Sequence, residues 1–217
     1  MPVRLWLAMT AYALKLSGRA LVRRWPWLLA APAVSLLLKL LAGPVSMLGI
    51  AGGFVMGLVY AAAGSLLLYV GRGIIEQRRM DADDLTRGAG AFLGDVMNVL
   101  FVVWIVSMLS RVFPPVSLMV AAALVALPVF ETVALTSVGG FQAFGSAWAF
   151  FQRDAGAWLL GQLPVVALGA LVWRADGLVE LALAPVAFYV GFIYRGVLFL
   201  TLDSVAPHAR ARKFLAT

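Results

Sequence analysis

Three long apolar runs, each interrupted once near its middle, dominate this chain of 217 residues. The first run covers residues 25–71, has Lys39 as its only charge, and is interrupted at Gly43-Pro44. A helix needs about 20 mostly apolar residues to cross about 30 Å of hydrocarbon. Because proline cannot continue an ordinary helix and glycine favours a turn, this run predicts two crossing helices, over residues 25–42 and 45–71.

The other two runs have the same design. Residues 95–136 are interrupted between Arg111 and Pro115, and residues 155–202 between Arg174 and Gly177. These breaks predict four more crossing helices, over residues 94–112, 115–136, 155–173 and 178–202. The expected fold is therefore all-α. It is a polytopic transmembrane helix bundle of six spanning helices arranged as three hairpins, in a single integral membrane domain over residues 1–217.

The composition of the chain favours a lipid environment. Hydrophobic residues make up 63% of the chain and charged residues 12%, whereas charged residues make up about 25% of a soluble domain. A soluble domain of about 150 residues buries only about 70% of the surface that its unfolded chain exposes. In water this chain would therefore leave a large apolar surface exposed and would aggregate.

Each hairpin is preceded by a segment of a different kind. Residues 4–24 carry Leu5, Met9, Tyr12 and Leu16 at helical spacing together with several basic residues, which predicts an interfacial amphipathic helix. The corresponding segments before the second and third hairpins are residues 72–94 and 139–154. One interpretation of this alternation is that the chain repeats an interfacial segment plus a hairpin three times. Residues 203–217 are then expected to form a basic cytoplasmic tail.

The basic residues are distributed unequally between the two expected sides of the membrane. If the N-terminus is cytoplasmic, 13 Lys and Arg residues fall on that side, and only Lys39, Arg111 and Arg174 fall on the other. The positive-inside rule then places both termini in the cytoplasm. Because a nucleic-acid binder displays its basic residues as a patch on a polar surface, we expect membrane lipids and no nucleic acid as partners.

Two ionisable residues, Glu131 and Arg195, fall inside the expected crossing helices. Charged groups are costly in lipid, so such residues are functional candidates. Each lies near the expected cytoplasmic end of its helix, so the two side chains can form an intramembrane ion pair that locks the helices together or gates a cavity. The alternative is that Arg195 extends its head group to the interface and that Glu131 marks the end of its helix.

A row of small residues runs along the expected helix over residues 45–71. Gly49, Gly53 and Gly57 are spaced by four, and Ala61 continues the row. Small residues on one face let helices approach closely in lipid, where packing drives their association. The row therefore predicts a helix-packing face. Its neighbour is another helix of this chain or, alternatively, a second copy or another membrane subunit.

No catalytic or cofactor-binding pattern stands out in the sequence. Cysteine is absent, His208 is the only histidine, and the GxSxG, HExxH and Walker A patterns do not occur. Asp81, Asp83 and Asp84 lack the glycine and terminal glutamate of a calcium loop, so we expect a turn that caps the next helix, and a similar role for Asp95. The sequence thus gives no support for an enzyme, a metal site or a cofactor.

Residues 128–131 (PVFE) and 140–148 (GFQAFGSAW) resemble a pattern in bacterial multi-pass membrane proteins of unknown function. Those proteins are similar to the membrane domain attached to some glycerophosphodiester phosphodiesterases. The resemblance implies a membrane module in the bacterial cytoplasmic (inner) membrane and does not imply the hydrolytic activity.

Two functions are compatible with these features. The first is a non-catalytic accessory or assembly subunit that works through helix–helix contacts, which the small-residue row favours. The alternative is a transporter or permease component with a cavity near Glu131 and Arg195, because proline-broken helices can line cavities.

Overall fold

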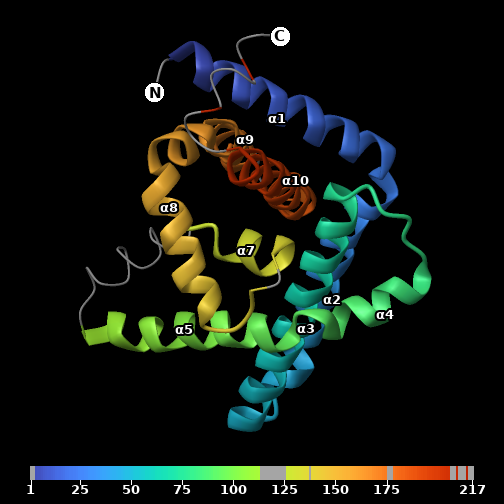
Figure 1. Ribbon diagram of the computed structural model, residues 1–217. Helices are drawn as coiled ribbons and strands as arrows, with labels where there is room; N and C mark the ends of the chain where they lie inside the picture. Colours follow the sequence, from blue (N-terminus) through green and yellow to red (C-terminus); the bar gives the residue numbers. More distant parts are fainter. Residues whose placement is uncertain are drawn as a thin grey trace. The chain divides into compact units, whose positions relative to one another are not determined.

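The protein is built from helices. The computed structural model describes residues 3–112, 126–136, 138–174, 178–205, 209 and 214, and within them every long regular element is helical (Figure 1). The elements are α1 (Val3–Arg23), the 3₁₀ helix η1 (Trp25–Leu29), α2 (Ala30–Ser46), α3 (Gly49–Ile75), α4 (Ala82–Ala91), α5 (Leu93–Val112), α7 (Val129–Leu135), α8 (Gln142–Gly161), α9 (Leu163–Trp173) and α10 (Leu178–Asp203). The predicted all-α class is confirmed.

The chain divides into two compact units. Unit 1 consists of Met1–Ala33, Gly71–Arg79 and Phe150–Thr217, so it contains both ends of the chain. Unit 2 consists of Val34–Val70 and Met80–Ala149. Each unit has buried residues of its own.

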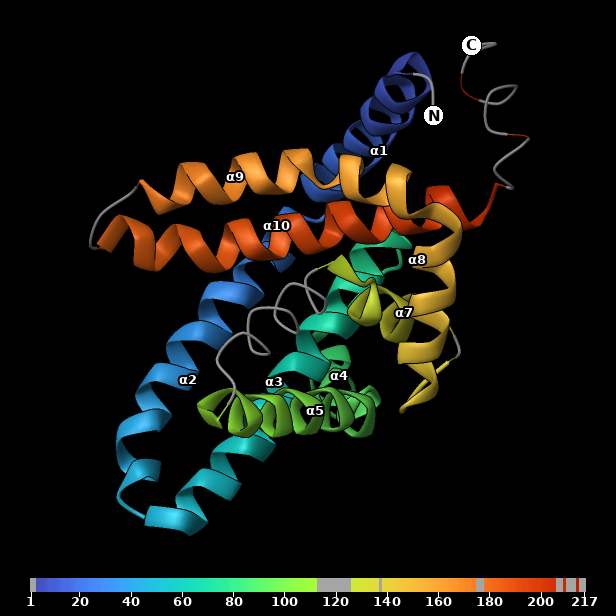
Figure 2. The ribbon, with the colours of Figure 1, turned by 90° about the vertical axis from the view of Figure 1, so that its left-hand side faces the viewer.

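The core of unit 1 forms between the first helix and the last. α1 packs against α10, and α9 lies antiparallel beside α10 (Figure 2). The buried residues of α1 are spaced by three or four positions and therefore share one helix face. They are Leu5, Met9, Ala13, Ser17 and Ala20, and Thr10 beside Met9 is buried as well. The predicted helix over 4–24 is confirmed, but the predicted stripe is wrong at Tyr12, which is exposed, whereas the neighbouring Ala13 is fully buried.

A bend at Gln162 separates α8 from α9, whose axes differ by 46°. Pro164 follows in the first turn of α9, where it cannot continue the hydrogen-bond pattern of α8. The Tyr194 hydroxyl donates a 2.8 Å hydrogen bond to the Gly161 carbonyl, a backbone group near the end of α8. The predicted boundary between residues 139–154 and 155–173 is wrong, because α8 runs unbroken through it and the helix breaks next to the proline.

Side-chain hydrogen bonds fasten α4 to α3 in unit 2. The buried Ser65 hydroxyl donates to the Gly88 carbonyl at 2.7 Å and accepts the Phe92 N–H at 2.8 Å. The Tyr69 hydroxyl donates to the Asp84 carboxylate at 2.8 Å. The second half of α3 is therefore tied to α4 by polar contacts as well as by apolar packing.

Two aspartates organise helix starts in unit 2. Asp81 caps α4, because its carboxylate accepts the Asp84 N–H while the Asp84 carboxylate accepts the Asp81 N–H, which together form a capping box. The capping role predicted for this turn is confirmed. Asp95 lies in the first turn of α5 and accepts a hydrogen bond from the Gly140 N–H, so it anchors the turn that precedes α8.

The turn between α2 and α3 lies later than the predicted break at Gly43-Pro44. α2 continues through Pro44 to Ser46, and the chain turns at Met47 and Leu48 before Gly49, whose φ is 59°. Glycine adopts this left-handed conformation without steric cost. The predicted position is wrong because the proline lies within the last turns of α2, and the glycine with the positive φ makes the turn.

Among the described residues, three helical stretches are long and apolar enough to cross a membrane, and the number rises to five if each of two bent pairs is one span. The single stretches are Trp25–Ser46, Gly49–Ile75 and Leu183–Asp203, and the bent pairs are Ala82–Ala91 with Leu93–Met108 and Gln142–Gly161 with Leu163–Trp173. These apolar helices are compatible with a membrane-embedded protein. The predicted breaks at Pro114-Pro115 and Asp176-Gly177, and most of the basic tail, lie outside the described residues.

The predicted span over residues 115–136 is not one continuous helix. Residues 113–125 lie outside the described residues, the chain leaves helical structure at Leu127 and Pro128, and α7 then has only 7 residues. A helix of that length rises about 10 Å, which is too short to cross a bilayer alone. The expectation of an uninterrupted helix to residue 136 is therefore wrong, because Pro128 interrupts it.

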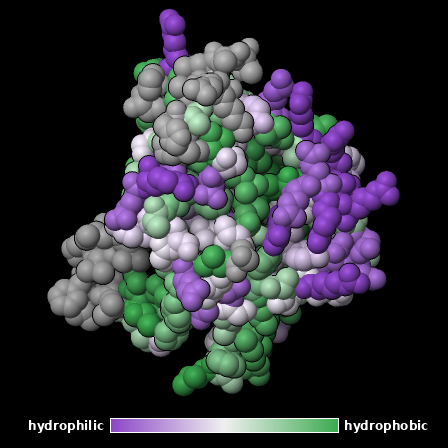
Figure 3. All heavy atoms as spheres, viewed as in Figure 1, coloured by the Kyte–Doolittle hydropathy of each residue, from purple (hydrophilic) through white to green (hydrophobic). Residues whose placement is uncertain are grey.

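Large apolar side chains are exposed around the turn between α2 and α3. Ile50 is 96% exposed and Met47 is 88% exposed. Figure 3 shows hydrophobic surface over this turn, and it also shows hydrophilic side chains gathered over the C-terminal half of α1. Surface as apolar as that around Ile50 marks a contact with lipid or with another protein.

Candidate functional site

Glu131 lies in the buried core of unit 2. It is in the first turn of α7, three residues after the N-cap residue Pro128, and is only 1% exposed. A carboxylate in a first turn is stabilised by the positive end of the helix dipole. The interpretation of Glu131 as the end of a helix is therefore wrong, because it stands near the start of one. An apolar cluster holds α7, formed by Val99, Val129 and Ala147 with Leu127, Phe130 and Phe144.

Arg195 lies on α10 against an aromatic ring of unit 1. Its guanidinium carbon is 5.1 Å from the centroid of the Trp158 ring, within the range of a cation–π contact. Trp158 is fully buried, and the Phe150 ring packs edge-on against it at 5.6 Å. The half-buried Arg195 head group therefore contacts α8.

The predicted ion pair joins residues of different units, since Glu131 belongs to unit 2 and Arg195 to unit 1. Each has an environment of its own, the first turn of α7 for Glu131 and the Trp158 ring for Arg195. Their pairing, and the gating of a cavity by them, stay predictions.

A charge network that sequence reasoning missed joins α8 to the end of α10. Arg153 donates from Nε to the Asp154 carboxylate at 2.7 Å and from Nη2 to the Asp203 carboxylate at 2.8 Å. Asp154 is buried, and a buried carboxylate is costly without a cationic partner. The sequence signal is the adjacent Arg153-Asp154 pair, but Asp203 is too distant in sequence to be assigned to it.

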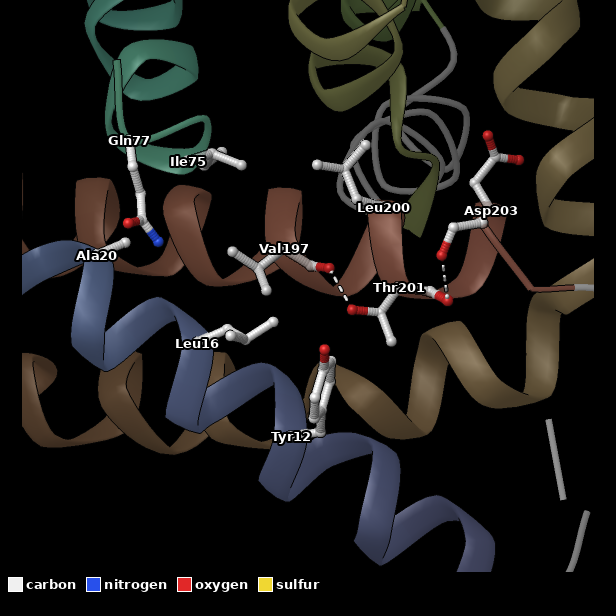
Figure 4. Close-up of a pocket in the computed structure, with 10 residues that line it drawn as sticks. Tyr12, Leu16, Ala20, Ile75, Gln77, Val197, Leu200, Thr201 and Asp203 are labelled. Atoms are coloured by element: carbon white, nitrogen blue, oxygen red, sulfur yellow. Dashed lines mark hydrogen bonds between the residues drawn. The ribbon is translucent and has the colours of Figure 1, made fainter. Parts of the chain in front are cut away.

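An open groove of about 330 Å³ lies between α1, α10 and the end of α3 in unit 1 (Figure 4). Tyr12, Leu16 and Ala20 project from α1 toward α10. The lining combines apolar residues, which include Leu16, Ala20, Ile75 and Val197, with polar ones, which include Tyr12, Gln77, Thr201 and Asp203. The Thr201 hydroxyl donates to the Val197 carbonyl at 2.7 Å. A groove with an apolar lining and a few polar groups suits an amphipathic ligand.

The small-residue row of α3 divides into two parts. Gly49 is the first residue of α3, directly after the turn, and a side chain added at Gly53 or Gly57 would meet nothing within 4 Å among the described residues. Ala61 is fully buried. Within this part of the chain the row therefore packs at its Ala61 end, and a packing neighbour for Gly53 and Gly57 stays a prediction.

Close approach occurs at other glycines of α3. A Cβ at Gly52 would overlap with the Val45 carbonyl, and a Cβ at Gly64 would lie 3.0 Å from the Val96 side chain. These positions lack a regular small-residue spacing, so sequence reasoning did not single them out.

The described residues contain no group of three or more acidic or histidine side chains that could hold a metal ion. In comparisons with protein-family models, curated proteins and solved structures, the chain matches none. The resemblance of residues 128–148 to bacterial multi-pass membrane proteins therefore stays an expectation.

Proposed function

We propose that this protein is a non-catalytic, multi-pass membrane protein that acts as an accessory or assembly subunit through helix–helix contacts. One observation carries the proposal. Ile50, Gly53, Phe54 and Gly57 share one face of α3, the two large side chains are exposed, and the two glycines have open space beside them among the described residues. Small and large residues alternating on an exposed face suit a partner helix in lipid.

The proposed topology has six crossings in three hairpins, with both termini on the cytoplasmic side of the bacterial inner membrane. The three single stretches and the two bent pairs support five of them. The sixth is the proposed span over residues 115–136, of which α7 would form the last part. A broken helix is tolerated at membrane depth where protein buries it, and most of α7 is buried.

Cysteine labelling tests this topology cleanly, because the chain has no native cysteine. Single-cysteine variants at the exposed Met47 and Trp173 should react with a membrane-impermeant maleimide on intact cells, since both lie at proposed outer turns. Ala82→Cys should react only after the membrane is opened. Labelling of Ala82→Cys in intact cells, or protection of Met47→Cys, would contradict the proposed orientation.

Purification in mild detergent tests the function. A tagged full-length protein should retain a partner subunit or a second copy in stoichiometric amount, and Gly53→Ile/Gly57→Ile should lose it because bulky side chains separate the helices. Gly169→Ile is the matched control, since Gly169 is an exposed glycine of α9 with the same open space. A monomeric wild-type protein without a stoichiometric partner, or equal retention by the double variant, would sink the proposal.

A transporter or permease component is the second candidate. Its specific support is the buried Glu131 beside the helix break at Pro128, because broken helices with charged residues line transport pathways. Glu131→Gln, Arg195→Gln and the double variant separate a paired from an unpaired arrangement by their folded yield. Losses that simply add would show that the two residues do not pair, and a water-inaccessible Glu131 would remove the support for a pathway.

A further inference from the structure

A basic stripe lies on the side of α1 that does not pack against α10. Lys15, Arg19 and Arg23 are spaced by four, so they lie one above another on the helix. All three line an open hollow of about 670 Å³, together with Leu14, Val22 and Gln77. This set of residues is called the basic hollow below.

The positive charge of the basic hollow is not neutralised within the described residues. α1 contains no acidic residue, and none of the ion pairs among the described residues includes Lys15, Arg19 or Arg23. Like charges four residues apart on a helix destabilise it. An anion from outside the chain would relieve this repulsion.

The uncharged residue Gln77 lies at one edge of the basic hollow and accepts hydrogen bonds from two arginines. Arg23 Nη1 donates to the Gln77 side-chain oxygen at 2.9 Å, and Arg24 Nη2 donates to the Gln77 carbonyl at 3.1 Å. Gln77 itself has a φ of 54°, a conformation that is uncommon for a residue with a side chain. The two arginines therefore fix the segment after α3 beside α1, and their partner carries no charge.

A second apolar stripe of α1 borders the basic hollow and is exposed. Val3, Leu7, Leu14 and Val22 share a face that differs from the buried one, and Val22 is 75% exposed. A soluble anion such as free phosphate would leave these side chains in water. An exposed aliphatic stripe beside a cationic stripe instead matches a molecule with an acyl chain and an anionic head.

We propose that the basic hollow binds the headgroup of an anionic membrane phospholipid, with the phosphate beside Lys15 and Arg19 and an acyl chain along Leu14 and Val22. Charge complementarity selects this occupant, because basic surfaces next to apolar ones bind anionic lipids in preference to zwitterionic ones. The inference rests on the proposed membrane location and adds a lipid class to it.

Native mass spectrometry of the full-length protein in detergent tests this. The protein is titrated with phosphatidylglycerol or with phosphatidylcholine of the same acyl chains, and the bound lipids are counted. Phosphatidylglycerol should bind more tightly, and Lys15→Gln/Arg19→Gln should weaken its binding about 25-fold, since each basic residue near an anionic headgroup contributes about fivefold. Binding of phosphatidylcholine should not change.

The matched control is Arg79→Gln/Arg87→Gln, which removes the same charge from two exposed arginines outside the basic hollow. An equal loss in the control would overturn the proposal, since it would reveal an effect of net charge alone. Equal binding of the two lipids would also overturn it, and so would full displacement of phosphatidylglycerol by glycerol phosphate at equal concentration, which would mean that the acyl chain adds nothing.

Carbonate extraction of the native membranes is run in parallel to separate this inference from the proposed function. A protein that stays in the membrane but shows no preference for phosphatidylglycerol contradicts the lipid site alone. A protein that carbonate releases contradicts the membrane location as well.

Discussion

The two halves of α3 have similar sequences and different surroundings. In the first half, residues 49–60, large apolar side chains such as Ile50, Phe54 and Tyr60 are exposed. In the second half, which runs from Ala61 to Val70 in unit 2, Ala61 and Ser65 are fully buried. Both halves contain glycines and aliphatic residues throughout.

The difference shows which residues mark a packed helix surface in an apolar chain. Hydropathy does not separate the halves, because lipid and a protein core are equally apolar surroundings for aliphatic residues. Ser65 and Tyr69 do separate them, since each hydroxyl finds a partner on α4 or just after it. In this helix the polar side chains are a better guide to the packed half than the glycine spacing.

The largest decrease in the unfolding temperature is expected for Ser65→Ala. The change removes the hydroxyl that donates to the buried Gly88 carbonyl and that accepts from the Phe92 N–H. The Phe92 N–H keeps its contact with the Gly90 carbonyl, whereas the loss of a partner at a buried backbone group costs about 1–3 kcal/mol. The unfolding temperature in detergent, followed by tryptophan fluorescence, should fall clearly. Ser46→Ala at the other end of the hairpin is the control, because within the described part of the chain that exposed hydroxyl bonds only to the nearby Gly43 carbonyl. Equal shifts for both variants would refute the contrast between the halves.

An intermediate decrease in the unfolding temperature is expected for Gly64→Leu. The added side chain would meet Val96 of α5, and overpacking of this kind costs about 1–3 kcal/mol. Gly53→Leu should leave the unfolding temperature of the purified monomer unchanged, because nothing among the described residues lies within 4 Å of that position. If Gly53→Leu lowered the temperature as much as Gly64→Leu, the first half would have to be packed within the monomer.

The smallest effect is expected for Tyr69→Phe, which removes the hydrogen bond to the Asp84 carboxylate and keeps the ring. A single hydrogen bond contributes about 1 kcal/mol. Tyr60→Phe, in the exposed first half, is the reference and should not change the free energy of unfolding. A larger loss for Tyr60→Phe than for Tyr69→Phe would reverse the assignment of the two halves.

Sequence reasoning predicted the helices best where an apolar run has no internal break. The bounds of α5 and α10 agree with the predicted spans over residues 94–112 and 178–202. It was wrong where the backbone conformation of one residue sets the position of a turn. An example is Gly49, whose positive φ the sequence does not reveal. Pro164 was a visible signal for the bend after α8, but the polar residues near Asp154 suggested an earlier boundary.

For the candidate sites, sequence reasoning identified the charged residues but did not predict which residues surround them. Glu131 and Arg195 stand out because they are charges within apolar runs. The burial of Glu131 at the start of a short helix depends on Pro128, and the contact of Arg195 with Trp158 depends on how α8 and α10 pack. Contacts between residues distant in sequence, such as Arg153 with Asp203, are set by tertiary packing and carry no local pattern.

Unit 1 is assembled from the beginning, the middle and the end of the chain, which has a consequence for synthesis on the ribosome. The buried face of α1 is made first, yet the helix that covers it, α10, is made last. At about 5–20 residues per second, α1 waits about 10–40 s for its partner. During that time Leu5, Met9 and Ala13 need a temporary apolar neighbour, and the membrane surface or a chaperone would have to supply it.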